Sequence, residues 1–322
     1  MSPVQNPAGL FQSILCPVDF STLSRIALQH AVAVARRTRG RVTAMYADDP
    51  MLVSAAAAGY NRQFLTKQTT SALGRLMTRV GVPLDRDPRA AGIVCAIGRP
   101  AQEILRVARR MGTDLIVMGT QGRSGAGRMF FGSVTDRVLR RTTIPVLAVP
   151  PGVSARGLTS WPGNRILCAV ELSPRAREDV RAAAEIARVF GRDLTLVHIV
   201  TPTPGAPWLA RALRGHDRAR LKAARARLEE LARWARTLLG AHVESRALLG
   251  HPAEEISAMA NDIRAGLIVL TLRRGHGLFG ARQGTITYQV LCGAATPVLA
   301  LRQQSPPGRK PPFQGRESGG SR

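Results

Sequence analysis

Cysteine and long apolar runs are scarce in this chain, and each scarcity excludes a class of protein. The four cysteines, Cys16, Cys95, Cys168 and Cys292, stand singly, a spacing that fits reduced thiols better than a disulfide framework or a zinc site. No apolar run approaches the roughly 20 residues that cross a bilayer. The N-terminal residues show no basic stretch followed by an apolar core, the pattern of a secretory signal. We therefore expect a globular, cytoplasmic protein without a membrane partner.

Acidic residues are also in short supply. The chain has 21 Asp and Glu against 46 Lys and Arg, which gives a net charge of +25. Such a charge concentrates polyanions, including ATP and nucleic acids. The basic residues are nearly all arginine and are spread along the whole chain, which favours a solvated basic surface. A nucleic-acid-associated protein remains the alternative, with weak and nonspecific binding expected.

The chain repeats itself at a fixed offset of 152 residues. Residues 14–21 align with 166–173, residues 98–104 with 250–256, and residues 145–147 with 297–299. This repeat predicts two domains, at 10–150 and 163–302, joined by a linker rich in proline and glycine. Residues 303–322 lack apolar periodicity and are expected to form a disordered tail.

Within each copy, short apolar runs alternate with longer amphipathic stretches. This pattern predicts βα units that build a doubly wound, five-stranded parallel sheet, a Rossmann-like α/β fold. In copy one, we expect strands at 13–18, 41–46, 93–96, 115–118 and 145–149, and helices at 24–39, 63–80, 101–111 and 132–141. In copy two, residues 208–239 predict a long, arginine-rich helix whose leucines pack on the sheet. A nucleic-acid or membrane-surface helix is the alternative there.

A glycine-rich segment, residues 119–133, follows the fourth expected strand of copy one. Ligands of open α/β sheets bind at the carboxyl ends of strands, and glycines followed by a helix N-terminus suit a phosphate chain. The segment is not a P-loop, because Gly127 is followed by Arg128 instead of Lys and then Ser or Thr. A dinucleotide fingerprint would stand after the first strand, where the sequence has Pro17-Val18-Asp19 instead.

The spacing Gly119-x2-Gly122-x9-Gly132-Ser133 resembles the signature of ATP-binding universal stress proteins. Asp19, at the end of the first expected strand, resembles that family's other hallmark. The resemblance covers residues 10–150 closely and 163–302 more loosely. It implies an adenine nucleotide alpha hydrolase-like fold that binds ATP with Mg²⁺.

The resemblance also implies roles for residues after the first strand. Asp19 would accept hydrogen bonds from the nucleotide, while Pro17 and Val18 would line its adenine and ribose side. The bland alternative is that Asp19 caps the next helix.

Further roles are implied for the glycine-rich segment. Gly119 and Gly122 would let the loop wrap the phosphates, and Gly132 and Ser133 would donate hydrogen bonds to them. Arg123 would neutralise phosphate charge. The bland alternative for Ser133 is a simple helix N-cap.

Copy two departs from this motif. Thr271 replaces Gly119, Arg274 replaces Gly122 and Glu171 replaces Asp19, while Gly284 and Thr285 survive. We expect the copy-two site to be degenerate, with one nucleotide bound per chain. The final strands, at 146–149 and 298–301, are expected to pair and to join the copies as an intrachain pseudo-dimer, and a homodimer of chains stays open.

No constellation of catalytic residues stands out beside the loop. The leading interpretation is a nucleotide-dependent stress-response regulator without strong catalysis, acting on an unknown protein partner. A slow ATPase or a transferase is the enzymatic alternative.

Overall fold

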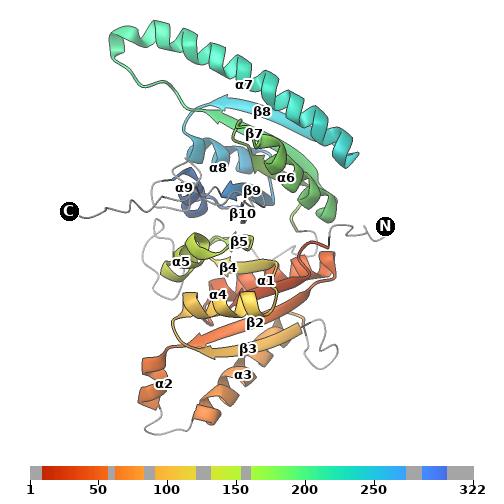
Figure 1. Cartoon of the computed structure of the whole chain (residues 1–322), viewed down its shortest axis with the longest axis vertical. Coiled ribbons are helices and arrows are strands. Elements are labelled where there is room, and N and C mark those ends of the chain that lie inside the picture. Colours follow the sequence, from red (N-terminus) through yellow and green to blue (C-terminus); the bar gives the residue numbers. More distant parts are fainter. Residues whose placement is uncertain are drawn as a thin grey trace, which may run out of the picture.

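The computed structural model describes residues 9–56, 62–82, 91–120, 132–153, 161–272 and 285–302. Its centre is one continuous 10-stranded sheet with the order β3-β2-β1-β4-β5-β10-β9-β6-β7-β8 (Figure 1). Each half of that order belongs to one copy of the repeat. The two expected five-stranded sheets are therefore confirmed, and they are fused edge to edge.

Copy one has the doubly wound arrangement that its sequence pattern predicts. All of its strand pairings are parallel, and β1 lies between β2 and β4. Its strands are β1 (Ser13–Pro17), β2 (Arg41–Asp48), β3 (Ala91–Ile97), β4 (Leu115–Gly119) and β5 (Val146–Val149). Its helices are α1 (Thr22–Thr38), α2 (Pro50–Ala56), α3 (Arg62–Arg79), α4 (Pro100–Arg110) and α5 (Ser133–Arg141).

Copy two repeats this arrangement, again with parallel pairings. Its strands are β6 (Arg165–Ala169), β7 (Asp193–Val200), β8 (Val243–Leu249), β9 (Leu267–Leu272) and β10 (Val298–Arg302). Its helices are α6 (Ala176–Phe190), the 3₁₀ turn η1 (Pro207–Leu209), α7 (Ala210–Leu239), α8 (Pro252–Asp262) and α9 (Ile286–Gly293).

The two copies meet where β5 pairs with β10 in the antiparallel direction. Leu147 lies opposite Leu299, and both are nearly fully buried, at 1% and 2% exposure. The pairing removes the edge that each five-stranded half would otherwise leave open. The predicted intrachain pseudo-dimer is thus confirmed.

Helices cover both faces of the fused sheet (Figure 1). Because side chains alternate along a strand, Leu147 belongs to a buried cluster that includes residues of α1, α3, α6 and α7, and its neighbour Ala148 belongs to a second cluster that includes residues of α4, α5, α8 and α9. Both clusters contain residues of both copies. In the first of these clusters the linker residue Trp161 contacts both copies. Its ring centroid lies 5.4 Å from that of His30 in copy one and 5.5 Å from that of Phe190 in copy two.

Three local features differ from the sequence-based expectation. Helix α1 begins at Thr22 because the Ser21 hydroxyl accepts a hydrogen bond from the Ser24 amide at 3.1 Å. Helix α2 was not expected at all. In α7, Leu228 and Leu231 are buried as expected, but Leu238 is 42% exposed, so the leucine stripe packs only in part.

Candidate functional site

A cavity of about 380 Å³ opens at the carboxyl ends of β1, β2 and β4 in copy one. Its volume is in the range of small-molecule sites. The strand order reverses between β1 and β4, and ligands of open α/β sheets bind at such a point. The lining residues are Pro17, Val18, Asp19, Ser24, Met45, Tyr46, Ala47, Pro100, Ile104, Met118, Gly119, Gly132, Ser133, Val134 and Thr135.

Most of the predicted site residues meet in this cavity although about a hundred positions separate them in the sequence. Six of them line it: Pro17, Val18, Asp19, Gly119, Gly132 and Ser133. Gly122 and Arg123 lie outside the described residues. The structure therefore brings the two sequence motifs together at one place, and the binding role of each residue stays a prediction.

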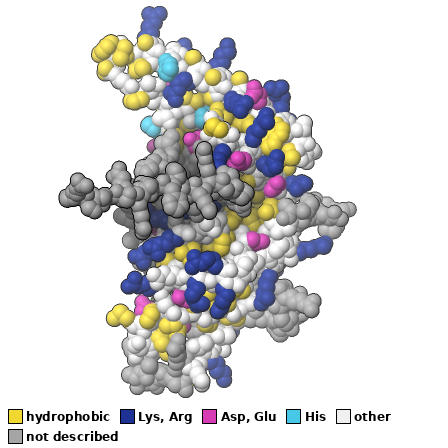
Figure 2. Space-filling view, in the orientation of Figure 1, with side chains coloured by type: hydrophobic (Ala, Val, Ile, Leu, Met, Phe, Trp, Pro, Cys, Tyr) yellow, Lys and Arg dark blue, Asp and Glu magenta, His cyan; other side chains and the backbone are white. Residues whose placement is uncertain are grey.

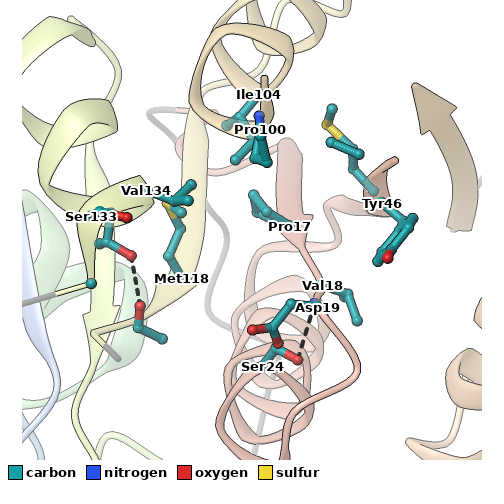
Figure 3. A pocket seen from close by; sticks show the side chains of 15 residues that line it. Pro17, Val18, Asp19, Ser24, Tyr46, Pro100, Ile104, Met118, Ser133 and Val134 are labelled. Carbon is teal, nitrogen blue, oxygen red and sulfur yellow. Dashed lines mark hydrogen bonds between the residues drawn. The ribbon is translucent and has the colours of Figure 1, made fainter. Parts of the chain in front are cut away.

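Asp19 follows β1 and presents a carboxylate at the cavity (Figure 3). Its Oδ1 accepts a hydrogen bond from the Ser21 amide at 3.0 Å, and its own amide donates to the Ser24 hydroxyl at 3.3 Å. Burial alone would raise the pKa of Asp19, but hydrogen bonds from Ser21 and Ser24 outweigh it and hold that pKa below its ordinary value. The carboxylate is consequently ionised at neutral pH.

Asp19 is also not the cap of α1, because Ser21 fills that position. The bland interpretation of Asp19 as a helix cap is therefore wrong. Its side chain instead holds the turn between β1 and α1 through the Ser21 amide.

The first turn of α5 forms another wall of the cavity. Gly132 is the N-cap, and its amide donates to the Thr120 carbonyl at 2.7 Å. The first helical residues, Ser133, Val134 and Thr135, line the cavity, and first-turn amides have no acceptor within their own helix. These amides and the helix dipole favour an anion at this wall.

Ser133 is the first residue of α5 and not its N-cap, so the bland interpretation of this serine is wrong as well. Its side chain is exposed at the cavity. The Thr135 hydroxyl donates to the Gly119 carbonyl at 2.8 Å. This bond ties the start of α5 to the end of β4, where the glycine-rich segment begins.

Apolar side chains make the remaining walls. Figure 3 shows Tyr46 and Ser133 on opposite sides of Pro17, with Pro100 and Ile104 of α4 above them. The Tyr46 ring lies against Phe20, with 5.1 Å between the ring centroids. The cavity is thus apolar over α4 and β2 and polar at Asp19 and α5.

Several lining residues were not predicted from the sequence, among them Ser24, Tyr46, Pro100, Ile104 and Met118. Most of them share one signal, since they stand at the end of a strand or the start of the helix that follows. A rule that collects such positions from neighbouring strands would have found them. Ile104 and Ser24 lie on helix faces, and only the packing of those helices reveals them.

The corresponding positions of copy two carry different chemistry. Ala176 replaces Ser24 and is 1% exposed, and His198 replaces Tyr46. The His198 Nδ1 lies 2.8 Å from the Val170 carbonyl oxygen. Because a carbonyl oxygen can only accept, Nδ1 carries the proton in this hydrogen bond. Thr271, in place of Gly119, is 9% exposed. Arg274 and Gly284 lie outside the described residues.

Neither a metal-ligand cluster nor a membrane-spanning helix is present among the described residues. In the ranges given above, no three His, Cys, Asp or Glu side chains gather as metal ligands. Likewise, no helix in the described part of the chain is both long and apolar enough to cross a membrane.

The fold and the cavity define a tandem α/β protein with a ligand-sized site at the carboxyl edge of its first half. The model of the universal stress protein family matches residues 10–150 and 163–302, and the chain belongs to that family.

Three individual proteins illustrate what the chain is similar to. A universal stress protein of Methanocaldococcus jannaschii is 31% identical over 155 residues, which are 46% of this chain and 87% of the relative. The crystal structure of a universal stress protein from Archaeoglobus fulgidus covers 92% of this chain and 98% of its own, with 17% identity and a TM-score of 0.61. Another structure from that organism, solved in complex with dAMP, is 25% identical, covers 42% of this chain and 96% of its own, and has a TM-score of 0.31.

Proposed function

We propose that copy one binds ATP together with Mg²⁺ in this cavity, and that the chain is a cytoplasmic, nucleotide-dependent stress-response regulator. One observation carries the proposal: an ionised carboxylate, Asp19, and the first turn of a helix, α5, face one cavity of nucleotide size. A nucleotide needs an acceptor for its hydroxyl or amino groups and donors for its phosphates, and these two walls supply both.

The lining residues fit the parts of ATP. Asp19 would accept hydrogen bonds from the nucleoside, and Val18 with Ile104 would contact the base. Ser133 and the first-turn amides of α5 would donate to the phosphates. Mg²⁺ prefers phosphate oxygens and water and needs few protein ligands, so Asp19 as the sole lining carboxylate among the described residues suits this ion.

Regulation without strong catalysis is proposed because the cavity offers poor acid–base chemistry. Among the described lining residues, Asp19 is the one side chain that titrates between acid and neutral pH, and its pKa is lowered. A general base works best with a pKa near the working pH. Asp19 is therefore better suited to binding than to proton transfer.

One nucleotide per chain is proposed because copy two loses the Ser24 hydroxyl and carries a branched side chain where copy one has Gly119, although Glu171 keeps a carboxylate in place of Asp19. Ser24 and Gly119 become Ala176 and Thr271. A β-branched side chain at the end of the strand leaves less room and tolerates fewer backbone conformations than glycine does. Copy two would serve as the structural or signalling partner of copy one.

Calorimetric titration of the full chain tests the proposal. We expect a stoichiometry near one, with Mg²⁺-ATP bound more tightly than AMP. Asp19→Asn should weaken binding, whereas Asp48→Asn, which alters a half-buried carboxylate at the end of β2, should not. Gly119→Thr installs the copy-two residue in copy one and should abolish binding. Equal affinity for AMP and ATP, or two nucleotides per chain, would contradict the proposal. Steady-state phosphate release comparable to that of an ATPase would contradict the regulatory role.

A further inference from the structure

Helix α7 is much longer than its counterpart in copy one. It has 30 residues, and α3 has 18. From Ala224 onward its buried residues pack on copy two, but between Ala210 and Ala223 Asp217 is the one buried side chain. Figure 1 shows this first half of α7 reaching past the end of the sheet. We call η1 and residues 210–223 the arm.

The arm carries a row of unpaired cations. Arg211, Arg214, Arg218 and Lys222 are spaced by three or four residues, which places them on one face of the helix, and all four are exposed. We call these four residues the basic stripe. Within the described residues none of them has an ion-pair partner, whereas Arg220, Arg227 and Arg236 of the same helix each pair with an acid.

The acidic residue of the arm does not neutralise the stripe. Asp217 is 5% exposed and accepts hydrogen bonds from the Thr203 amide, the Thr203 hydroxyl and Arg220. Arg220 also donates to the Thr201 carbonyl at 3.0 Å. These bonds fasten the segment before η1 to the helix. The stripe is therefore a set of like charges on a fixed support, an arrangement that disfavours the helix unless an anion binds there.

An exposed aromatic side chain stands at the free end of the arm. Trp208 lies in η1, three residues before Arg211, and is 81% exposed. Figure 2 shows hydrophobic side chains gathered at this end of α7 and Lys and Arg side chains along it. The bonds around Asp217 fasten residues 201 and 203, shortly before η1, to the helix, so the backbone that carries the indole lies close to a fixed point.

We propose that the arm binds single-stranded nucleic acid, with its phosphates on the basic stripe and a base stacked on Trp208. Single-strand sites combine a cationic track with an aromatic platform in this way and need no sequence-specific contact. The stripe runs from Arg211 to Lys222, 12 residues, or about 16 Å of helix at roughly 1.5 Å per rise, which suits a few nucleotides. Helix α7 packs on β7 and β8 at the outer edge of copy two, and its arm projects from there, remote from the cavity of copy one (Figure 1).

A membrane surface fits the arm less well. An interfacial helix inserts a continuous apolar face. Here Leu213 is half-buried and lies so close to Gly205 that a Cβ at that position would meet its Cδ1. Leu221 packs on the core. The exposed residues beside the stripe are small or polar, such as Gly215, His216 and Ala219. The exposed apolar residues at the free end, such as Pro204, Pro207 and Trp208, form a short tip and not a face that continues along the helix.

Fluorescence anisotropy with a labelled poly-thymidine oligonucleotide and a duplex of equal length tests the proposal. The variant Arg211→Gln/Arg214→Gln/Arg218→Gln/Lys222→Gln removes the stripe. Its matched control, Arg75→Gln/Arg79→Gln/Arg109→Gln/Arg110→Gln, removes the same charge from exposed positions of α3 and α4. Thermal unfolding confirms that both variants fold.

The stripe variant should lose about 100-fold or more in single-strand affinity at low salt. The slope of log affinity against log salt should become about 2.8 units shallower, since each lost phosphate contact removes roughly 0.7. The control should change affinity by less than about threefold. Trp208→Ala should lose about tenfold, within the range of one stacked base, and Trp208→Phe should restore most of it. ATP should leave these affinities unchanged, so a failure of this proposal can be distinguished from a failure of the proposed nucleotide site.

Three results would overturn the proposal. The control variant could weaken binding as much as the stripe variant, which would assign binding to overall charge. The duplex could bind more tightly than the single strand, with Trp208→Ala silent. Finally, anionic phosphatidylserine vesicles could bind the chain through the stripe while oligonucleotides do not, which would identify a membrane surface as the partner.

Discussion

Arg302 of copy two holds the helix whose first turn lines the cavity of copy one. Its Nη2 donates to the carbonyls of Leu139 at 2.6 Å and Arg140 at 3.0 Å, in the last turn of α5. Last-turn carbonyls have no partner within their own helix, and a cation at that end also complements the dipole. We predict that Arg302→Met, which keeps the aliphatic stem, destabilises α5.

The magnitude follows from the contacts. A hydrogen bond to a charged group contributes about 1.5–3 kcal/mol when buried, and the helix-end charge adds about 0.3–1 kcal/mol. Because Arg302 is half-buried and one nitrogen serves both carbonyls, we expect a total near 2 kcal/mol. At roughly 2 °C per kcal/mol for a chain of this size, the unfolding temperature should fall by about 4 °C.

The effect should also reach the nucleotide site. Helix α5 has nine residues, too few to be stable without its tertiary contacts. At most the whole 2 kcal/mol, about 30-fold, can appear as lost ATP affinity, and we expect a few-fold loss. Hydrogen exchange of the α5 amides should accelerate. Arg140→Gln is the control, because it removes an exposed pair with Asp136 from the same helix and should cost only about 0.3–0.5 kcal/mol. Unchanged α5 exchange in Arg302→Met, or an equal effect of the control, would refute the reasoning.

Three further predictions concern the β5–β10 pairing, the buried His30 of α1 and the candidate site. Leu299→Ala should lower the free energy of unfolding by about 2–5 kcal/mol, measured with denaturant, since Leu299 is buried where β10 pairs with β5. A loss below about 1 kcal/mol would argue that this pairing is loosely packed. Burial lowers the pKa of His30 below 6.5 despite its bond to the Ile26 carbonyl, so the unfolded state binds more protons. Stability should therefore fall as the pH drops below about 6.5, less steeply in His30→Phe; identical pH profiles would contradict this. Thr135→Val removes the bond to Gly119 and should cost about 1 kcal/mol of stability and weaken ATP binding, while Thr78→Val, on exposed α3, should leave ATP binding unchanged.

The sequence by itself determined the repeat, the fold class and the place of the candidate site. Alternating apolar and amphipathic segments are local signals, so strand and helix positions could be predicted to within a few residues. Asp19 and the described ends of the glycine-rich segment could be expected at one cavity because the carboxyl ends of parallel strands meet at one edge. The β5–β10 pairing was likewise predictable, since two short apolar edge strands need a partner.

The tertiary structure decided what depends on side chains that are distant in sequence. Ser24 and Ile104 became cavity walls only through the packing of α1 and α4. Ser21, and not Asp19, caps the start of α1. The local sequence pattern alone could not decide between these two residues. Arg302 donates to the Leu139 carbonyl of α5 although 163 positions separate them in the sequence, so no local motif could predict the contact. Local preferences fix which elements form, whereas the geometry of the fused sheet fixes which side chains meet.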